Sequence, residues 1–122
     1  MIQSFSFRYG THSGKMEWYR VEEEKGAFFM HIDKWDEKEY AYHGEVENGF
    51  LKALEEKIKV LGMAEWNGFR DIDACLCSGD SWVLHISYSY GQEVHAMGHS
   101  AYPKGFEAGV KGIEILFDKF LN

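Results

Sequence analysis

The chain has 122 residues and a net charge of −7, and it is 45% hydrophobic and 16% aromatic. This length predicts a single domain over residues 1–122, and the composition excludes intrinsic disorder. The acidic excess repels phosphate backbones and anionic lipids, so we expect no nucleic-acid or membrane partner. The start of the chain lacks a signal-peptide pattern, and no apolar run is long enough to span a bilayer. These features predict a cytoplasmic protein.

Alternation with a period of two residues predicts three strands at the start of the chain. Phe5, Phe7 and Tyr9 point to one side of the first, which ends at the turn sequence YGTHSG. The second strand, MEWYRV, ends at EEEKG. The third, AFFMHI, places Phe29 and His31 on the face opposite its other apolar side chains. The short loops between these runs predict an antiparallel meander.

The middle of the chain changes from an irregular to a helical pattern. Residues 33–48 are highly charged and show no clear period, so we interpret them as a long connection. Apolar residues then recur at helical spacing. They predict an amphipathic helix that begins at Glu45 or Asn48 and ends at Leu61, where Gly62 supplies a left-handed stop.

The sequence SWVLHISYSY alternates without a break, which predicts a strand, and VHAMG predicts a returning strand after a turn at Gly91. The turn is either Tyr90-Gly91 or Gly91-Gln92. The two choices differ by two residues in pairing, and both place His85 on the face opposite His95.

A second helix is predicted at the end of the chain. Pro103 suits its first turn, with Ser100 or the residues just after it as the cap. Its apolar face holds Phe106, Val110, Ile113, Phe117 and Phe120. Three glycines follow the shoulder of that face: Gly105, Gly109 and Gly112. Such a row predicts a backbone pressed close against a neighbouring element, and the alternative is three unrelated weak positions.

These elements give the order β-β-β-α-β-β-α, with a further short strand near Cys75 as an option. The fold class is therefore α+β, with an antiparallel sheet of about five strands and both helices packed on one face. We expect the opposite face of the sheet to carry aromatic residues such as Trp18 or Phe29.

The sequence predicts no catalytic residues, metal or cofactor. His95 and His99 are four apart on a strand, roughly 13 Å, so they cannot share one ion, and His85 is expected on the other face. Cys75 and Cys77 close almost no loop and are interpreted as free thiols in a reducing compartment.

Several ring-bearing side chains form a candidate ligand-binding set. Stacked aromatic rings can bind a sugar, a base or a partner, but aromatics at a period of two are also typical of a core. The candidates are Trp18, Trp66, Trp82, Tyr88 and His95.

The motifs WNGF, W-x-L-x-I-x-Y and G-x-x-A-Y-P-x-x-F resemble small bacterial proteins of unassigned function, over residues 66–106. Where this pattern has Asn before Ala101, the chain has Ser100, which keeps the capping chemistry. The resemblance implies an α+β fold and no particular activity.

We therefore expect a non-enzymatic protein-interaction or self-associating module, which uses its open sheet face or its glycine-lined helix. One alternative is a small-ligand binding domain with an aromatic pocket. The other is a thiol-dependent enzyme that uses Cys75 or Cys77.

Overall fold

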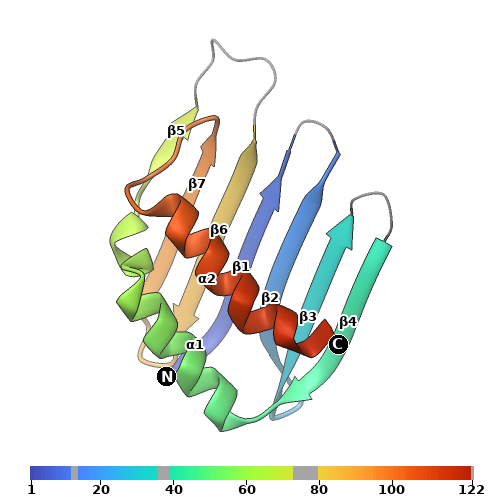
Figure 1. The fold of residues 1–122 in the computed structure, drawn as a ribbon. Coiled ribbons are helices and arrows are strands. Elements are labelled where there is room, and N and C mark those ends of the chain that lie inside the picture. Colours follow the sequence, from blue (N-terminus) through green and yellow to red (C-terminus); the bar gives the residue numbers. More distant parts are fainter. Residues whose placement is uncertain (12–13, 36–38, 73–79, 122) are drawn as a thin grey trace.

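In the part of the chain that the structure describes, seven strands form one sheet, in the order β4-β3-β2-β1-β6-β7-β5 (Figure 1). The structure, a computed structural model, describes residues 1–11, 14–35, 39–72 and 80–121. The strands are β1 (Ile2–Gly10), β2 (Met16–Glu24), β3 (Ala27–Trp35), β4 (Glu39–Val46), β5 (Arg70–Ile72), β6 (Ser81–Tyr88) and β7 (Glu93–His99).

Both helices lie on one face of this sheet, α1 (Asn48–Val60) beside α2 (Phe106–Asp118), which crosses the strands diagonally (Figure 1). Short 3-10 helices follow them, η1 (Met63–Trp66) and η2 (Lys119–Leu121). The α+β class and the one-sided helix layer are confirmed. The expected antiparallel sheet of about five strands is wrong in detail, because β5 pairs in parallel with β7 and β4 is an additional strand.

β4 lies within the segment that the sequence suggested was a connection. It pairs with β3 along its whole length, from Glu39 to Val46. Its alternation is hard to recognise because a glycine, Gly44, takes one inward position. The Tyr42 ring fills that space, since a Cβ on Gly44 would lie 2.5 Å from the Tyr42 hydroxyl. The Tyr42 ring also packs near Phe120, with ring centroids 5.9 Å apart.

The hairpin between β6 and β7 corrects the expected facing of the histidines. Ser87 pairs with Glu93, and the Tyr88 amide donates to the Gln92 carbonyl, which leaves a loop of three residues. A loop with an odd number of residues shifts the pairing by one, so side chains exchange faces relative to a two-residue turn. His85 therefore stands directly opposite His95, on the same face.

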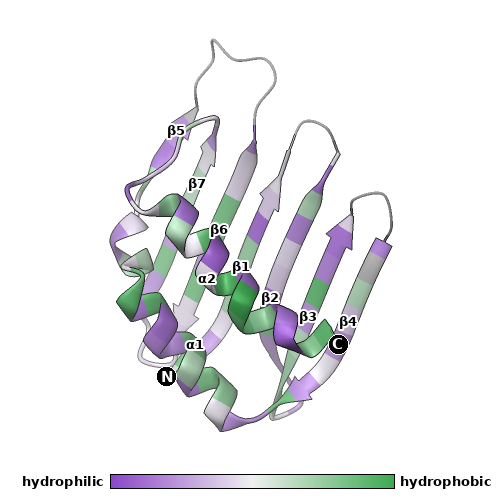
Figure 2. Cartoon of the chain, in the orientation of Figure 1, coloured by the Kyte–Doolittle hydropathy of each residue, from purple (hydrophilic) through white to green (hydrophobic). Residues whose placement is uncertain are grey.

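The core lies between the sheet and the helices. Hydrophobic residues alternate with hydrophilic ones along the strands, as Figure 2 shows. Two phenylalanines on α2 organise it. The Phe117 ring lies 5.7 Å from the ring of Phe5 and 5.2 Å from that of Tyr19. The Phe106 ring lies 4.9 Å from Trp82 and 5.5 Å from Trp66.

Two of the three glycines in the predicted row permit a close helix contact. A Cβ on Gly109 would lie 2.5 Å from the Trp66 ring, and one on Gly112 would lie 2.7 Å from Leu61. The predicted close approach is thus confirmed at these two positions. Gly105 serves differently: it precedes α2 with a left-handed φ of 81°, so the helix begins after it rather than near Pro103.

We predict that Gly109→Ala destabilises the protein by about 1–3 kcal/mol, because the added methyl group overlaps the buried Trp66 ring. Gly49→Ala is the matched control. Gly49 lies in α1 with open space around it, so alanine there should stabilise the protein by up to ~1 kcal/mol. Urea unfolding of both variants checks this, and equal effects at the two glycines would contradict it.

Candidate functional site

The sheet face that neither α1 nor α2 covers, called the open face here, carries a transverse row of polar side chains. Strand register fixes this row, because residues paired across neighbouring strands point to the same face. The row contains one residue from each of six strands, in the order His43, His31, Arg20, Ser6, His85 and His95. We call it the histidine row.

Trp18 lies beside the middle of the histidine row, between two arginines. The Arg20 guanidinium is 4.0 Å from the centroid of the Trp18 ring, and the Arg8 guanidinium is 5.4 Å from it. The indole nitrogen donates a 2.9 Å hydrogen bond to the Ser6 hydroxyl, which fixes the ring. A cation over an indole face gains about 0.5–1 kcal/mol at an exposed site.

The two arginines differ in their electrostatic partners. Arg20 pairs with Asp33 at 3.4 Å and with Glu22 at 3.5 Å. Arg8 is exposed, and no ion pair joins it to any residue in the described part of the chain. Its guanidinium therefore presents donors to solvent beside an aromatic ring.

Arginine and histidine lie on one side of the sheet, and lysine lies elsewhere. All three arginines of the sequence, Arg8, Arg20 and Arg70, have side chains at the open face. The described histidines also lie there: His31, His43, His85, His95 and His99. The described lysines instead lie in turns, on the helices or, for Lys34, on the helix side, where Asp118 binds it at 2.8 Å.

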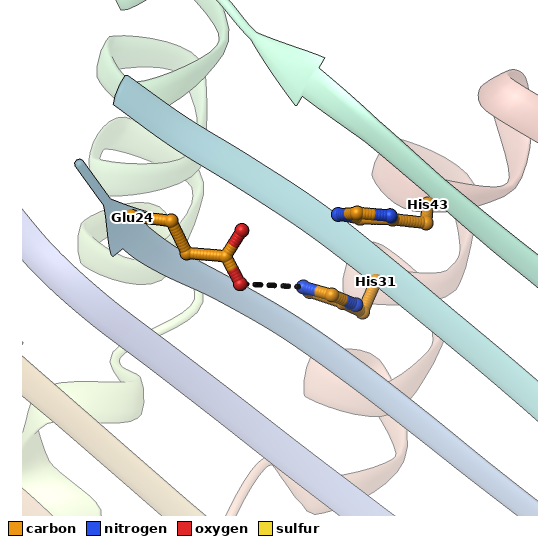
Figure 3. A group of neighbouring side chains, drawn as sticks. All are labelled: Glu24, His31 and His43. Carbon is orange, nitrogen blue, oxygen red and sulfur yellow. Dashed lines mark ion pairs between the residues drawn. The ribbon is translucent and has the colours of Figure 1, made fainter. Parts of the chain in front are cut away.

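At the β4 end of the histidine row, two imidazoles and a carboxylate converge (Figure 3). The His31 and His43 rings stack with centroids 4.3 Å apart and planes 15° apart. The Glu24 carboxylate reaches from the end of β2 to within 3.8 Å of the His31 Nε2 atom. That nitrogen is buried and has no hydrogen-bond partner among the described residues. Burial, followed by the nearby Arg20 and His43, lowers the pKa of His31, which favours its neutral form.

At the other end, the pair His85 and His95 has a different environment. The two rings are edge to face, with centroids 5.7 Å apart. The Nε2 atom of His85 lies 3.0 Å from the Glu93 carboxylate, and Arg70 lies 3.0 Å from Nδ1 of His95. One ring nitrogen of each histidine therefore contacts a neighbouring polar side chain.

A pocket of about 1030 Å³ lies on the helix side, where β1 meets the start of α2. Asp80 accepts hydrogen bonds there from the hydroxyls of Tyr9, at 2.6 Å, and Tyr102, at 3.3 Å. Burial and the hydrogen bond to Asp80 raise the pKa of Tyr9. The pocket thus has an aromatic wall, formed with Phe106, around a carboxylate that two phenols already bind.

The five ligand-binding candidates from the sequence do not form one site. Trp66, Trp82 and Tyr88 are buried on the helix side, and the rings of the two tryptophans are 5.9 Å apart. Trp18 and His95 lie on the open face, at separate strands. Period-two aromatics on β6 therefore belong to the core, whereas Trp18 is accessible.

Sequence reasoning missed the cluster of Glu24, His31 and His43 because it placed His43 in a connection. The signal was weak but present. In residues 39–46 the sequence EYAYHGEV alternates, and this alternation puts His43 on the face opposite Val46. Cys75 and Cys77, the proposed thiol pair, lie outside the described residues.

No protein-family model matches the chain, and a search of curated proteins finds no match. The resemblance to small bacterial proteins over residues 66–106 therefore stays a prediction. Among the described residues, neither helix combines the length and the apolar character needed to cross a membrane.

A charged cluster near the end of α2 gives the molecule a pH-dependent feature. Lys34 lies 3.4 Å from Glu17 and 2.8 Å from Asp118. Glu114 hydrogen-bonds to Glu17, and burial, this bond and the Glu17 charge raise the pKa of Glu114 to about 7. Glu114 therefore keeps its proton in the folded state up to near neutral pH.

We predict that the contribution of Glu114 to stability falls as the pH rises from about 4.5 to about 7, because the folded protein holds the Glu114 proton more tightly than the unfolded chain does. Glu114→Gln should remove this loss. At pH 8 the variant should be more stable than the wild type by on the order of 1 kcal/mol, with solvent screening allowed for. At pH 4 the two should be nearly equal.

Urea unfolding at both pH values measures this difference. Glu107→Gln is the control, because Glu107 is an exposed residue of the same helix. An equal gain at pH 4 and pH 8 for Glu114→Gln would show that the proton is not responsible.

Proposed function

We propose that the protein is a non-enzymatic protein-interaction module that binds its partner across the open face. The observation that carries this proposal is the arrangement around Trp18. A half-buried indole lies between Arg8 and Arg20, with the histidine row beside it. Tryptophan and arginine are the residues that most often dominate binding energy at protein interfaces, whereas lysine is depleted there.

The glycine row of α2 supports this assignment, because it is already occupied. Trp66 packs on the backbone of α2 at Gly109, and Leu61 does so at Gly112. The glycine-lined surface of α2 is therefore filled by the chain itself, which removes it as a route to self-association. The open face is the other surface that the sequence suggested for binding, and Trp18, Arg8 and Arg20 are residue types that are enriched at interfaces.

The chemistry of the open face indicates what kind of partner it fits. Arg8 offers guanidinium donors without a described carboxylate, so a partner that brings Asp or Glu side chains would satisfy them. The Trp18 ring offers apolar area next to these donors. A protein segment with mixed acidic and apolar side chains meets both requirements.

Site-specific photo-crosslinking in the native host tests the proposal. A crosslinking residue at Val83, which pairs with Arg8 on the open face, should capture a protein. The same residue at Val60, which is exposed on α1, should not. The mass of the adduct distinguishes a second copy of this chain from another protein. Equal capture at both positions, or capture of nucleic acid alone, would contradict the proposal.

We predict that Arg8→Glu weakens partner binding at least tenfold, about 1.4 kcal/mol, because it places a carboxylate where the partner supplies one. Stability should fall by no more than about 1 kcal/mol, since Arg8 is exposed and its contact with the Trp18 ring is worth about 0.5–1 kcal/mol. Lys104→Glu makes the same charge change near the start of α2 and should leave binding intact. The captured partner, titrated against the variants by calorimetry, gives the comparison.

A second candidate function is small-ligand binding in the pocket at Asp80, which its volume of about 1030 Å³ favours. A ligand there would need to replace the hydrogen bonds that Tyr9 and Tyr102 give to Asp80.

We predict that fragments whose NMR signals change on binding to the wild type no longer show these changes with Tyr102→Ala, because this substitution removes one wall of the pocket. Fragments that bind this variant as well as the wild type would remove the pocket from consideration.

The thiol-dependent enzyme remains a prediction from the sequence alone. Replacement of Cys75 and Cys77 by serine tests it, because an intact cellular phenotype would exclude a thiol mechanism.

A further inference from the structure

We propose that Glu24, His31 and His43 form a binding site for a divalent transition-metal ion, with Zn²⁺ as the best match. Their candidate ligand atoms all lie within 4.8 Å of one another. Two imidazole nitrogens and one carboxylate oxygen are a frequent ligand set for zinc, and this set leaves a coordination position open. The inference does not depend on the identity of the protein partner.

The backbone already holds the three residues in suitable places (Figure 3). His31 and His43 are direct partners in the antiparallel pairing of β3 with β4. Side chains paired in this way start from Cβ atoms about 5 Å apart. Glu24 ends β2, the strand on the other side of β3, and its carboxylate points to the His31 ring. Three adjacent strands thus each contribute one ligand.

Only side-chain rotations separate the observed arrangement from a bound ion. A tetrahedral ion with bonds of about 2.1 Å holds its ligand atoms roughly 3.4 Å apart. The stacked imidazoles must therefore tilt, and the carboxylate must move inward. Both changes are accessible, because χ2 of histidine is soft and the Glu24 side chain is 45% exposed at a strand end.

The buried nitrogen of His31 is the feature that indicates a ligand. Its Nε2 atom is shielded from solvent but makes no hydrogen bond to any described residue. A buried polar atom without a partner costs about 1–3 kcal/mol, so most such atoms are satisfied. The Glu24 oxygen at 3.8 Å is too far to satisfy it. An ion between them would accept the lone pair of His31 Nε2 and bind the Glu24 carboxylate.

The surrounding charges allow a cation at this position. Arg20 is the nearest opposing charge, but Asp33 and Glu22 bind it at 3.4 and 3.5 Å. Glu45 lies two residues from His43 on the same face of β4. The carboxylates around the site therefore outnumber the single guanidinium.

The pair His85 and His95 provides an internal comparison with the same composition. It too is a cross-strand histidine pair beside a glutamate, Glu93. There, however, Arg70 lies at hydrogen-bond distance from His95, and Glu93 binds His85. The rings meet edge to face at 5.7 Å. One nitrogen of each ring already has a protein partner, whereas Nε2 of His31 has none among the described residues, so we assign the ion to the His31 end of the row.

The experiment titrates Zn²⁺ into untagged protein by calorimetry, in a Cys75→Ser/Cys77→Ser background that removes thiol ligands. We expect one ion per chain. His43→Ala and Glu24→Gln should each weaken binding at least about tenfold, because each removes one of three ligands. Both side chains are substantially exposed, so the variants should fold, and circular dichroism checks this.

His85→Ala is the matched control and should bind as the parent protein does. Cobalt(II) gives a second readout, since its visible absorption reports coordination geometry and should change with His43→Ala but not with His85→Ala. Unchanged zinc affinity in His43→Ala and Glu24→Gln would overturn the proposal. Loss of binding in His85→Ala, or no saturable uptake at micromolar zinc, would overturn it as well.

Discussion

The contact between Trp66 and the backbone of α2 at Gly109 determines how the molecule divides into two sides. The indole approaches so closely that even a methyl group would overlap it, and Leu61 makes a similar contact at Gly112. These contacts join the end of α1 to α2 as one layer on one face of the sheet. Phe106 and Phe117 then anchor this layer to the strands beneath. The other face receives no described helix.

This one-sided layer explains where the polar chemistry collects. Inward positions of the central strands are filled by the core, so polar side chains on those strands point to the open face. Arginine and histidine lie there, and lysine lies mainly on the helices and turns. A planar guanidinium can stack on an indole and still donate hydrogen bonds, whereas an ammonium group is a strongly hydrated point charge. The open face therefore carries the planar guanidinium groups, whereas the strongly hydrated ammonium groups lie mainly on the helices and in the turns.

The spacing of apolar residues along the chain correctly predicted those elements whose pattern lies within one continuous segment. The first three strands, the helix ending near Leu61 and the close glycine contacts of α2 all follow from spacing along the chain. β4 was missed because Gly44 replaces an inward apolar residue, and Tyr42 fills the space from its own strand. The parallel pairing of β5 with β7 joins residues far apart in sequence, so no local pattern signals it.

The histidine row illustrates why the site was harder to predict than the fold. The pairing of the histidines is set by the length of the segment that joins two strands, and the pattern within either strand does not reveal it. His85 meets His95 because the hairpin loop has an odd number of residues, and His31 meets His43 because the segment after β3 returns as a strand. A change of one residue in either connection would send one ring to the core side. Loop length therefore sets the chemistry of the open face, while strand composition sets the core.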